Sequence, residues 1–83
     1  MSWNDDVLAA MRKLNGPAQI STIYVEVRKI RKNSGLSLPP STNAIIRRVL
    51  EEHSSDSDSF KYDDLYKMSY GKGEGYWEIK SKI

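Results

Sequence analysis

The spacing of apolar residues changes once along the 83-residue chain, and this change limits the folds open to it. Up to about His53, apolar residues recur every three or four positions, as they do on one face of an α-helix. From Leu65 the side chains alternate instead, and a GKGEG stretch at 71–75 separates two such segments. The pattern therefore predicts helices followed by a β-hairpin, which is an α+β arrangement.

The first helix is expected over 3–16. Asn4 is the predicted N-cap, because its side chain can accept a hydrogen bond from the first turn. Trp3 and Leu8 have the spacing of a hydrophobic staple across that cap. Gly16 and Pro17 are typical of a helix end.

A second helix is predicted over 22–35, with Ser21 as its cap and Gly35 at its end. The third, over 41–53, follows a proline pair. Either Pro40 occupies its first turn or Ser41 caps it.

A short strand is expected at 18–21, because AQIS is too short to stand alone and could pair with the later hairpin. The predicted order is then helix, strand, helix, helix, strand, hairpin tip, strand. Three helices with a small antiparallel hairpin in this order form a winged helix, so residues 1–83 are expected to be one winged-helix domain.

Charge is unevenly distributed, although the net charge is only +2. Residues 1–48 carry eight basic and three acidic side chains, a net +5, whereas 49–64 carry one basic and six acidic, a net −5. The remainder, 65–83, has four basic and two acidic, a net +2. This segregation predicts a basic face that suits a polyanion, although a solvated surface explains most charge runs.

The third predicted helix has the residues that a DNA major groove requires. A groove admits one helix and meets short polar side chains and long donors on it. Asn pairs with adenine, Arg pairs with guanine or with a phosphate, and small apolar groups touch base methyls. The predicted contacts are Ser41, Thr42, Asn43, Ala44, Arg47 and Arg48. The alternative is an ordinary amphipathic helix with a solvated outer face.

Two further basic segments are candidate phosphate contacts. Lys29 and Lys32 belong to the run RKIRK, which could equally complement the C-terminal end of its own helix. The predicted wing, 70–76, carries Lys72 and Gly73 at its tip, where the lysine or exposed backbone N–H groups could reach DNA. A plain β-turn with a solubilising lysine is the alternative.

No catalytic, metal or cofactor site is predicted. The chain has no cysteine and one histidine, so neither a thiolate site nor an all-protein zinc site is expected. His53 lies beside Ser54, Ser55 and Asp56, but a catalytic triad draws its members from separate elements. We therefore expect His53 to bond to local backbone at the helix end.

Three segments carry a family resemblance: ISTIYVEVRKIR, LSLPPSTNAIIRRVLEEHSSDS and GYWEI. They resemble the winged-helix domains attached to restriction endonucleases of the HNH and PD-(D/E)xK types, and most of all those of adenine-methylation-dependent enzymes. The resemblance implies a module that reads double-stranded DNA while a nuclease domain of a longer parent chain cuts it. It places 41–48 in the major groove and 70–75 as the wing. A methyl contact would fall on Thr42, on Ala44 or on a residue elsewhere.

The sequence also leaves other functions open. The acidic stretch 51–64 could dock a basic partner domain, and a stand-alone transcription regulator would have similar features. An enzyme in its own right is not expected. The first residues lack the basic segment of a signal peptide, and no apolar run is long enough to span a membrane. We expect a monomeric domain in the cytoplasm of a prokaryote.

Overall fold

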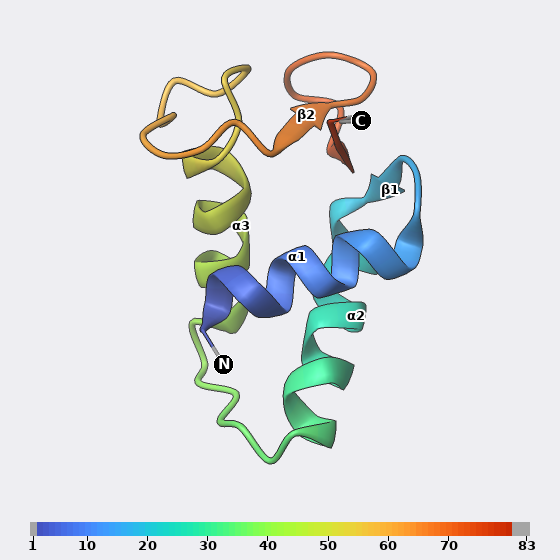
Figure 1. Ribbon diagram of the computed structural model, residues 1–83, viewed down its shortest axis with the longest axis vertical. Coiled ribbons are helices and arrows are strands. Elements are labelled where there is room, and N and C mark those ends of the chain that lie inside the picture. The colour runs from blue at the N-terminus through green and yellow to red at the C-terminus, as the bar shows by residue number, and fades with distance from the viewer. Residues whose placement is uncertain (1, 81–83) are drawn as a thin grey trace.

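The computed structural model of the protein describes residues 2–80 and has the predicted element order (Figure 1). Its elements are α1 (Trp3–Leu14), β1 (Ala18–Gln19), α2 (Ile20–Asn33), α3 (Thr42–Glu52), β2 (Tyr66–Met68) and β3 (Tyr76–Ile79). The α+β prediction is confirmed, since three helices accompany one three-stranded antiparallel sheet. This arrangement is compatible with a winged helix.

The sheet has the strand order β1-β3-β2, so the short early strand does join the later hairpin. Trp77 lies in the central strand, opposite Ala18 on one side and Met68 on the other. β1 is shorter than predicted because the chain turns into α2 at Ile20, whose N–H bonds to the Gly75 carbonyl at 2.8 Å. This bond fixes the start of α2 against the hairpin.

The start of α1 corrects the prediction that Asn4 is its cap. Ser2 is the N-cap, and it forms a capping box with Asp5, whose backbone N–H donates to the Ser2 hydroxyl. Trp3 is therefore the first helical residue and cannot form the predicted staple with Leu8. Its ring lies instead under the guanidinium of Arg31, which is 3.6 Å from the ring centroid.

The other two helices also begin one or two residues away from their predicted starts. Gln19 is the N-cap of α2, so the prediction that Ser21 caps it is wrong. Ser41 occupies the N-cap position of α3, as one of the two alternatives had it, but its hydroxyl makes no capping hydrogen bond.

No helix within residues 2–80 has the length and apolar character needed to cross a membrane.

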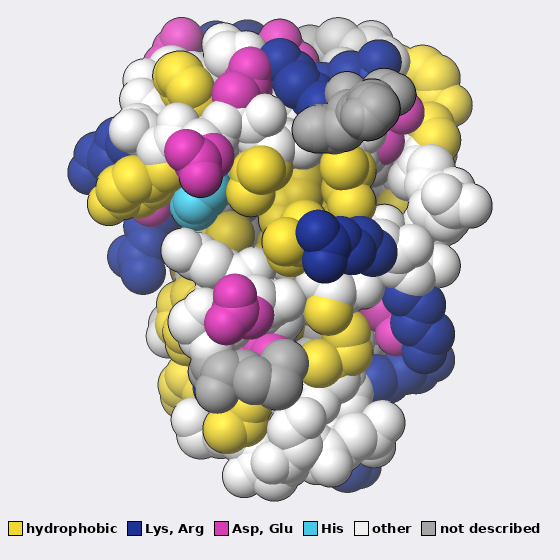
Figure 2. Space-filling view, in the orientation of Figure 1, with side chains coloured by type: hydrophobic (Ala, Val, Ile, Leu, Met, Phe, Trp, Pro, Cys, Tyr) yellow, Lys and Arg dark blue, Asp and Glu magenta, His cyan; other side chains and the backbone are white. Residues whose placement is uncertain are grey.

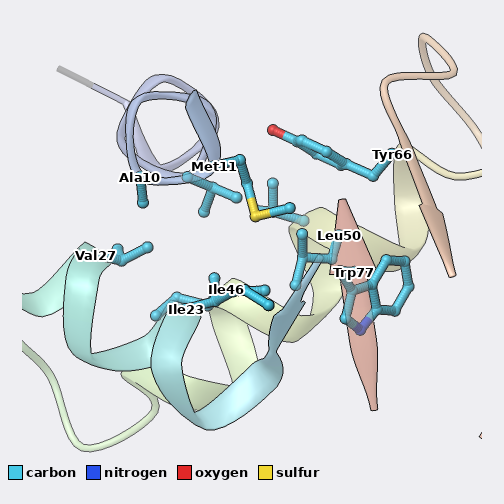
Figure 3. Packing of buried hydrophobic residues seen from close by; sticks show 11 residues of the cluster. Ala10, Met11, Ile23, Val27, Ile46, Leu50, Tyr66 and Trp77 are labelled. Atoms are coloured by element: carbon cyan, nitrogen blue, oxygen red, sulfur yellow. The ribbon is translucent and has the colours of Figure 1, made fainter. Parts of the chain in front are cut away.

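The core is formed where α1 lies across α2 and α3 and where the sheet closes one end of the molecule (Figures 1 and 3). Its buried members are Val7, Ala10, Met11, Ala18, Ile23, Val27, Ile46, Val49, Leu50, Tyr66 and Trp77. Tyr66 is fully buried with its hydroxyl pointing toward α1, and burial raises the pKa of that hydroxyl (Figure 3). The periodic apolar positions of all three helices thus meet in one cluster.

A buried ion pair joins α1 to the end of α2. Arg31 donates from Nη1 to the Asp6 carboxylate at 2.7 Å and from Nε to the Ser37 carbonyl at 3.0 Å. Both side chains are nearly inaccessible to solvent. One cation of the RKIRK run is therefore structural, because it is held by a carboxylate from another helix and by a carbonyl of the connection that follows α2.

Candidate nucleic-acid interface

The outer face of α3 carries most of the predicted DNA contacts. Its inner face packs into the core through Thr42, Ile46, Val49 and Leu50. The exposed side chains on the other side are Asn43, Ala44, Arg47 and Arg48, and Ser41 is exposed just before them. The helix therefore presents one small, one amide and two cationic side chains to solvent on a single face.

Thr42 is an exception that corrects the prediction. It is fully buried, and its hydroxyl donates to the carbonyl of Pro39 in the connection before the helix. A side chain without solvent exposure cannot contact a base edge or a base methyl. Thr42 instead holds the proline segment against the first turn of α3.

Asn43 is contacted by Arg28 of α2, a residue that the sequence reading did not single out as a DNA contact. Both Nε and Nη2 of Arg28 donate to Oδ1 of Asn43, at 3.3 and 3.0 Å. Fifteen residues separate the two in sequence. Only the packing of α2 beside α3 brings them together, so no local motif could have revealed this pair.

Lys29 and Lys32 are both exposed, as the phosphate prediction requires. Lys32 lies one helical turn beyond Arg28 and so on the same side of α2, whereas Lys29 is rotated by about 100° around the axis. Neither forms an ion pair within residues 2–80. Lys32 therefore extends the basic surface beside α3.

The hairpin tip is exposed and depends on its glycines. Gly71, Gly73 and Gly75 have φ angles of 102°, 88° and 79°, a conformation that other residues rarely adopt. A Cβ at any of them would meet nothing within 4 Å, so backbone conformation alone requires glycine here. Within residues 2–80 the N–H groups of Lys72 and Gly73 make no hydrogen bond, which leaves them open to an anion.

Arg47 of α3 and Lys72 of the tip line the same groove, which has a volume of about 460 Å³. Acidic residues line it as well. Arg47 pairs with Glu51 at 3.2 Å, and Lys72 pairs with Asp58 of the loop before β2 at 2.9 Å. All but Glu51 are highly exposed, so these pairs are weakly held and each contributes at most about 1 kcal/mol. Helix α3 and the hairpin tip therefore lie on one side of the molecule, and each has a cation in an exchangeable ion pair there.

The acidic loop at 54–64 uses several carboxylates internally. Asp56 accepts the backbone N–H of Met68, at the end of β2, at 2.9 Å. Asp64 accepts from Lys80 and from the Ser55 backbone and hydroxyl. The Lys80 hydrogen bond, followed by that of the Ser55 backbone, lowers the pKa of Asp64. The carboxylates therefore serve in part to order a loop that has few apolar residues.

His53 confirms the expectation of a local backbone bond. It is buried at the end of α3, and its Nδ1 lies 2.8 Å from the Val49 carbonyl. Since a carbonyl only accepts, Nδ1 must carry the hydrogen. Ser54, the next residue, is also fully buried.

A second hollow lies between α1 and the hairpin, with a volume of about 630 Å³. Arg12 and Lys80 line it together with Asp64 and Glu78, over an apolar floor. Figure 2 shows the face on which α1 lies, where both signs of charge are interspersed with apolar atoms. This face therefore suits a polyanion less well than the outer face of α3 does.

Together these features define a small α+β protein with a polar and basic helix face next to a glycine-rich hairpin. Comparisons with protein-family models, with curated proteins and with solved structures found no match to this chain.

Proposed function

We propose that this chain is a winged helix that binds double-stranded DNA. In this proposal the outer face of α3 enters the major groove, and the wing at 70–76 contacts the backbone or the minor groove. The observation that carries the proposal is that Arg47 and Lys72 line one groove, although 25 positions separate them in the sequence. A helix and a hairpin that share a side can contact one duplex together.

Affinity in the proposal comes from phosphate neutralisation. Arg48, Lys29 and Lys32 are exposed cations without an ion-pair partner within residues 2–80. Lys72 adds an ammonium and a neighbouring pair of unbonded backbone N–H groups at the tip. Each phosphate neutralised releases counterions, which makes binding fall steeply with salt.

The narrower part of the proposal rests on the sequence resemblance to winged helices of restriction enzymes. We propose that the domain is the DNA-targeting module of a modification-dependent restriction endonuclease in the cytoplasm of a prokaryote. The nuclease domain would be another part of the same parent chain. Of the two residues of this helix that were expected as possible methyl contacts, Ala44 is exposed and Thr42 is buried. A methyladenine contact on this helix would therefore fall on Ala44.

Docking of a basic partner by the acidic stretch gains no support from the geometry. Asp56 and Asp64 use their carboxylates to order the loop itself, through the Met68 backbone N–H and through Ser55 and Lys80. The exposed cations outside this stretch are therefore the better candidate for a binding surface.

Binding of a labelled duplex tests the proposal, with salt varied between about 50 and 200 mM. Arg47→Gln and Arg48→Gln should each weaken binding and reduce the salt dependence by about 0.9 in the log–log slope. Lys13→Gln is the control, because it removes from α1 one charge whose exposure is similar to that of Arg47. An equal effect of all three variants, or no duplex binding by the wild type, would contradict the proposal.

Selection of duplexes from a random pool, with and without adenine methylation, tests the narrower part. Enrichment that depends on methylation, and that Ala44→Gly reduces, supports methyl reading. Equal enrichment from both pools excludes it and leaves DNA binding as the function.

A further inference from the structure

The contact between Arg28 and Asn43 determines what the first turn of α3 can recognise. Asn43 is exposed in that turn, and Arg28 reaches it from α2 with two nitrogens on one oxygen. The first turn of a helix in the major groove is the part that meets base edges. The atoms that Asn43 has left for a base therefore decide its specificity.

The chemistry of the pair fixes the orientation of the amide. A guanidinium has only donors, so the group facing it must be the amide oxygen of Asn43 and cannot be its NH₂. Two N–H groups then occupy the two lone pairs of Oδ1. The NH₂ group of Asn43 is turned away from Arg28. Together the two side chains present donors and no unoccupied acceptor.

We infer that Arg28 and Asn43 form one donor-only surface that selects guanine in the major groove. The inference deepens the proposed DNA binding and rests on it. It replaces the sequence-based expectation that Asn43 pairs with adenine, because that pairing needs an amide oxygen free to accept from the adenine N6 amino group. Arg28 is then a specificity-determining residue that acts both by its own N–H groups and by orienting Asn43.

Base chemistry singles out guanine. Its major-groove edge presents two acceptors, N7 and O6, whereas adenine presents one acceptor and one donor, and cytosine presents a donor. Thymine offers a single acceptor beside a methyl group. Within residues 2–80 no carboxylate bonds to either Arg28 or Asn43, so nothing supplies the missing acceptor.

The simpler interpretation is that the hydrogen bonds between Arg28 and Asn43 only stabilise the packing of α2 against α3. The two readings differ in what they predict for base preference. A fastening bond affects stability and leaves preference unchanged, whereas a reading surface changes preference at one base pair. Arg28 and Asn43 both lie at the surface, so their variants should keep the fold, which thermal unfolding can confirm.

The experiment is a selection of bound duplexes from a random pool with the wild type, Arg28→Ala, Arg28→Lys and Asn43→Asp. The wild type should prefer guanine at one position by about tenfold. Arg28→Ala frees Oδ1 of Asn43, so the preference there should move toward adenine. Arg28→Lys keeps the charge but lacks the two-nitrogen fork, so the guanine preference should fall with little change in affinity for random DNA.

Asn43→Asp is the sharpest variant, because it is isosteric and can keep the contact with Arg28 while removing the outward donor. Its guanine preference should disappear. A wild-type preference for adenine at the Asn43-dependent position overturns the inference, as does an unchanged preference in Arg28→Ala. Absence of any duplex binding by the wild type is a different result, because it removes the proposed function as well.

Discussion

Two ion pairs of similar length join distant parts of this chain, and they differ in almost everything else. Arg31–Asp6 is 2.7 Å long, with side chains 7% and 0% exposed, and it connects α2 to α1. Lys72–Asp58 is 2.9 Å long, with side chains 60% and 92% exposed, and it connects the hairpin tip to the acidic loop. The same chemistry is therefore used once inside the molecule and once on its surface.

The difference in burial determines what each pair can do. A buried charge deprived of its partner remains in a medium that solvates it poorly, so Arg31 and Asp6 are held together. An exposed pair competes with water and salt, and its lysine can exchange the carboxylate for another anion. Lys72 is thus available to a DNA phosphate, whereas Arg31 is not, although both count equally in the net charge.

The largest expected effect comes from breaking the buried pair. Arg31→Met should lower the free energy of unfolding by about 3–5 kcal/mol, because it leaves the Asp6 carboxylate buried without a partner. Urea unfolding measures this, and Lys32→Met, an exposed cation one residue away, should change stability by no more than about 0.5 kcal/mol. Combining Arg31→Met with Asp6→Leu should recover much of the loss. Equal losses of stability in Arg31→Met and Lys32→Met would show that burial does not make Arg31 more important to the fold than Lys32.

Removing the exposed pair should have the opposite profile. Lys72→Gln should leave the free energy of unfolding within about 0.5 kcal/mol of wild type. It should lower duplex affinity for all sequences alike and reduce the salt slope by about 0.9. Fluorescence anisotropy at several salt concentrations measures both, with Lys13→Gln as the control of similar exposure. A change in base preference would mean that the tip reads bases and not phosphates.

Removing the acidic partner should have a smaller effect of the opposite sign. Asp58→Asn frees Lys72 from its carboxylate and should raise duplex affinity by about twofold, the size expected from an exposed pair. Asp63→Asn removes the same charge from the same loop at a residue without an ion-pair partner within residues 2–80. A larger gain in duplex affinity from Asp58→Asn than from Asp63→Asn shows that Asp58 competes with DNA for Lys72. Equal gains indicate only that the loop has lost one negative charge.

The same contrast explains what sequence could and could not reveal. Periodicity predicted the three helices, the hairpin and the exposed face of α3, because these are local patterns. It also placed His53 at a helix end, bonded to backbone. The buried ion pair of Arg31 could not be predicted from sequence, because its partner Asp6 lies 25 residues away and only the crossing of α1 and α2 brings the two together.

Two residues at the start of α3 make the same point for the candidate site. Thr42 and Asn43 are adjacent and both polar, yet one is buried against Pro39 and the other is exposed and held by Arg28. Their difference depends on where the proline connection returns to the helix. The proline pair predicts such a connection but not the path that it takes. The burial of Thr42 and the contact with Arg28 could therefore be found only from the folded structure.

The smallest predicted effect concerns an ion pair of intermediate exposure, Asp64–Lys80, and its dependence on pH. Lys80 and the Ser55 backbone N–H lower the pKa of Asp64 below its ordinary value of 3.8. The folded protein therefore binds this proton more weakly than the unfolded chain, and the contacts stabilise the fold above that ordinary pKa. The stabilisation is lost as the pH falls through the folded pKa. Asp64→Asn should consequently be less stable than wild type at about pH 7, and the difference should shrink as urea unfolding is measured at progressively lower pH below 3.8. A difference that persists at the lower pH would assign the effect to the hydrogen bonds of Ser55 with the neutral side chain and not to the charge.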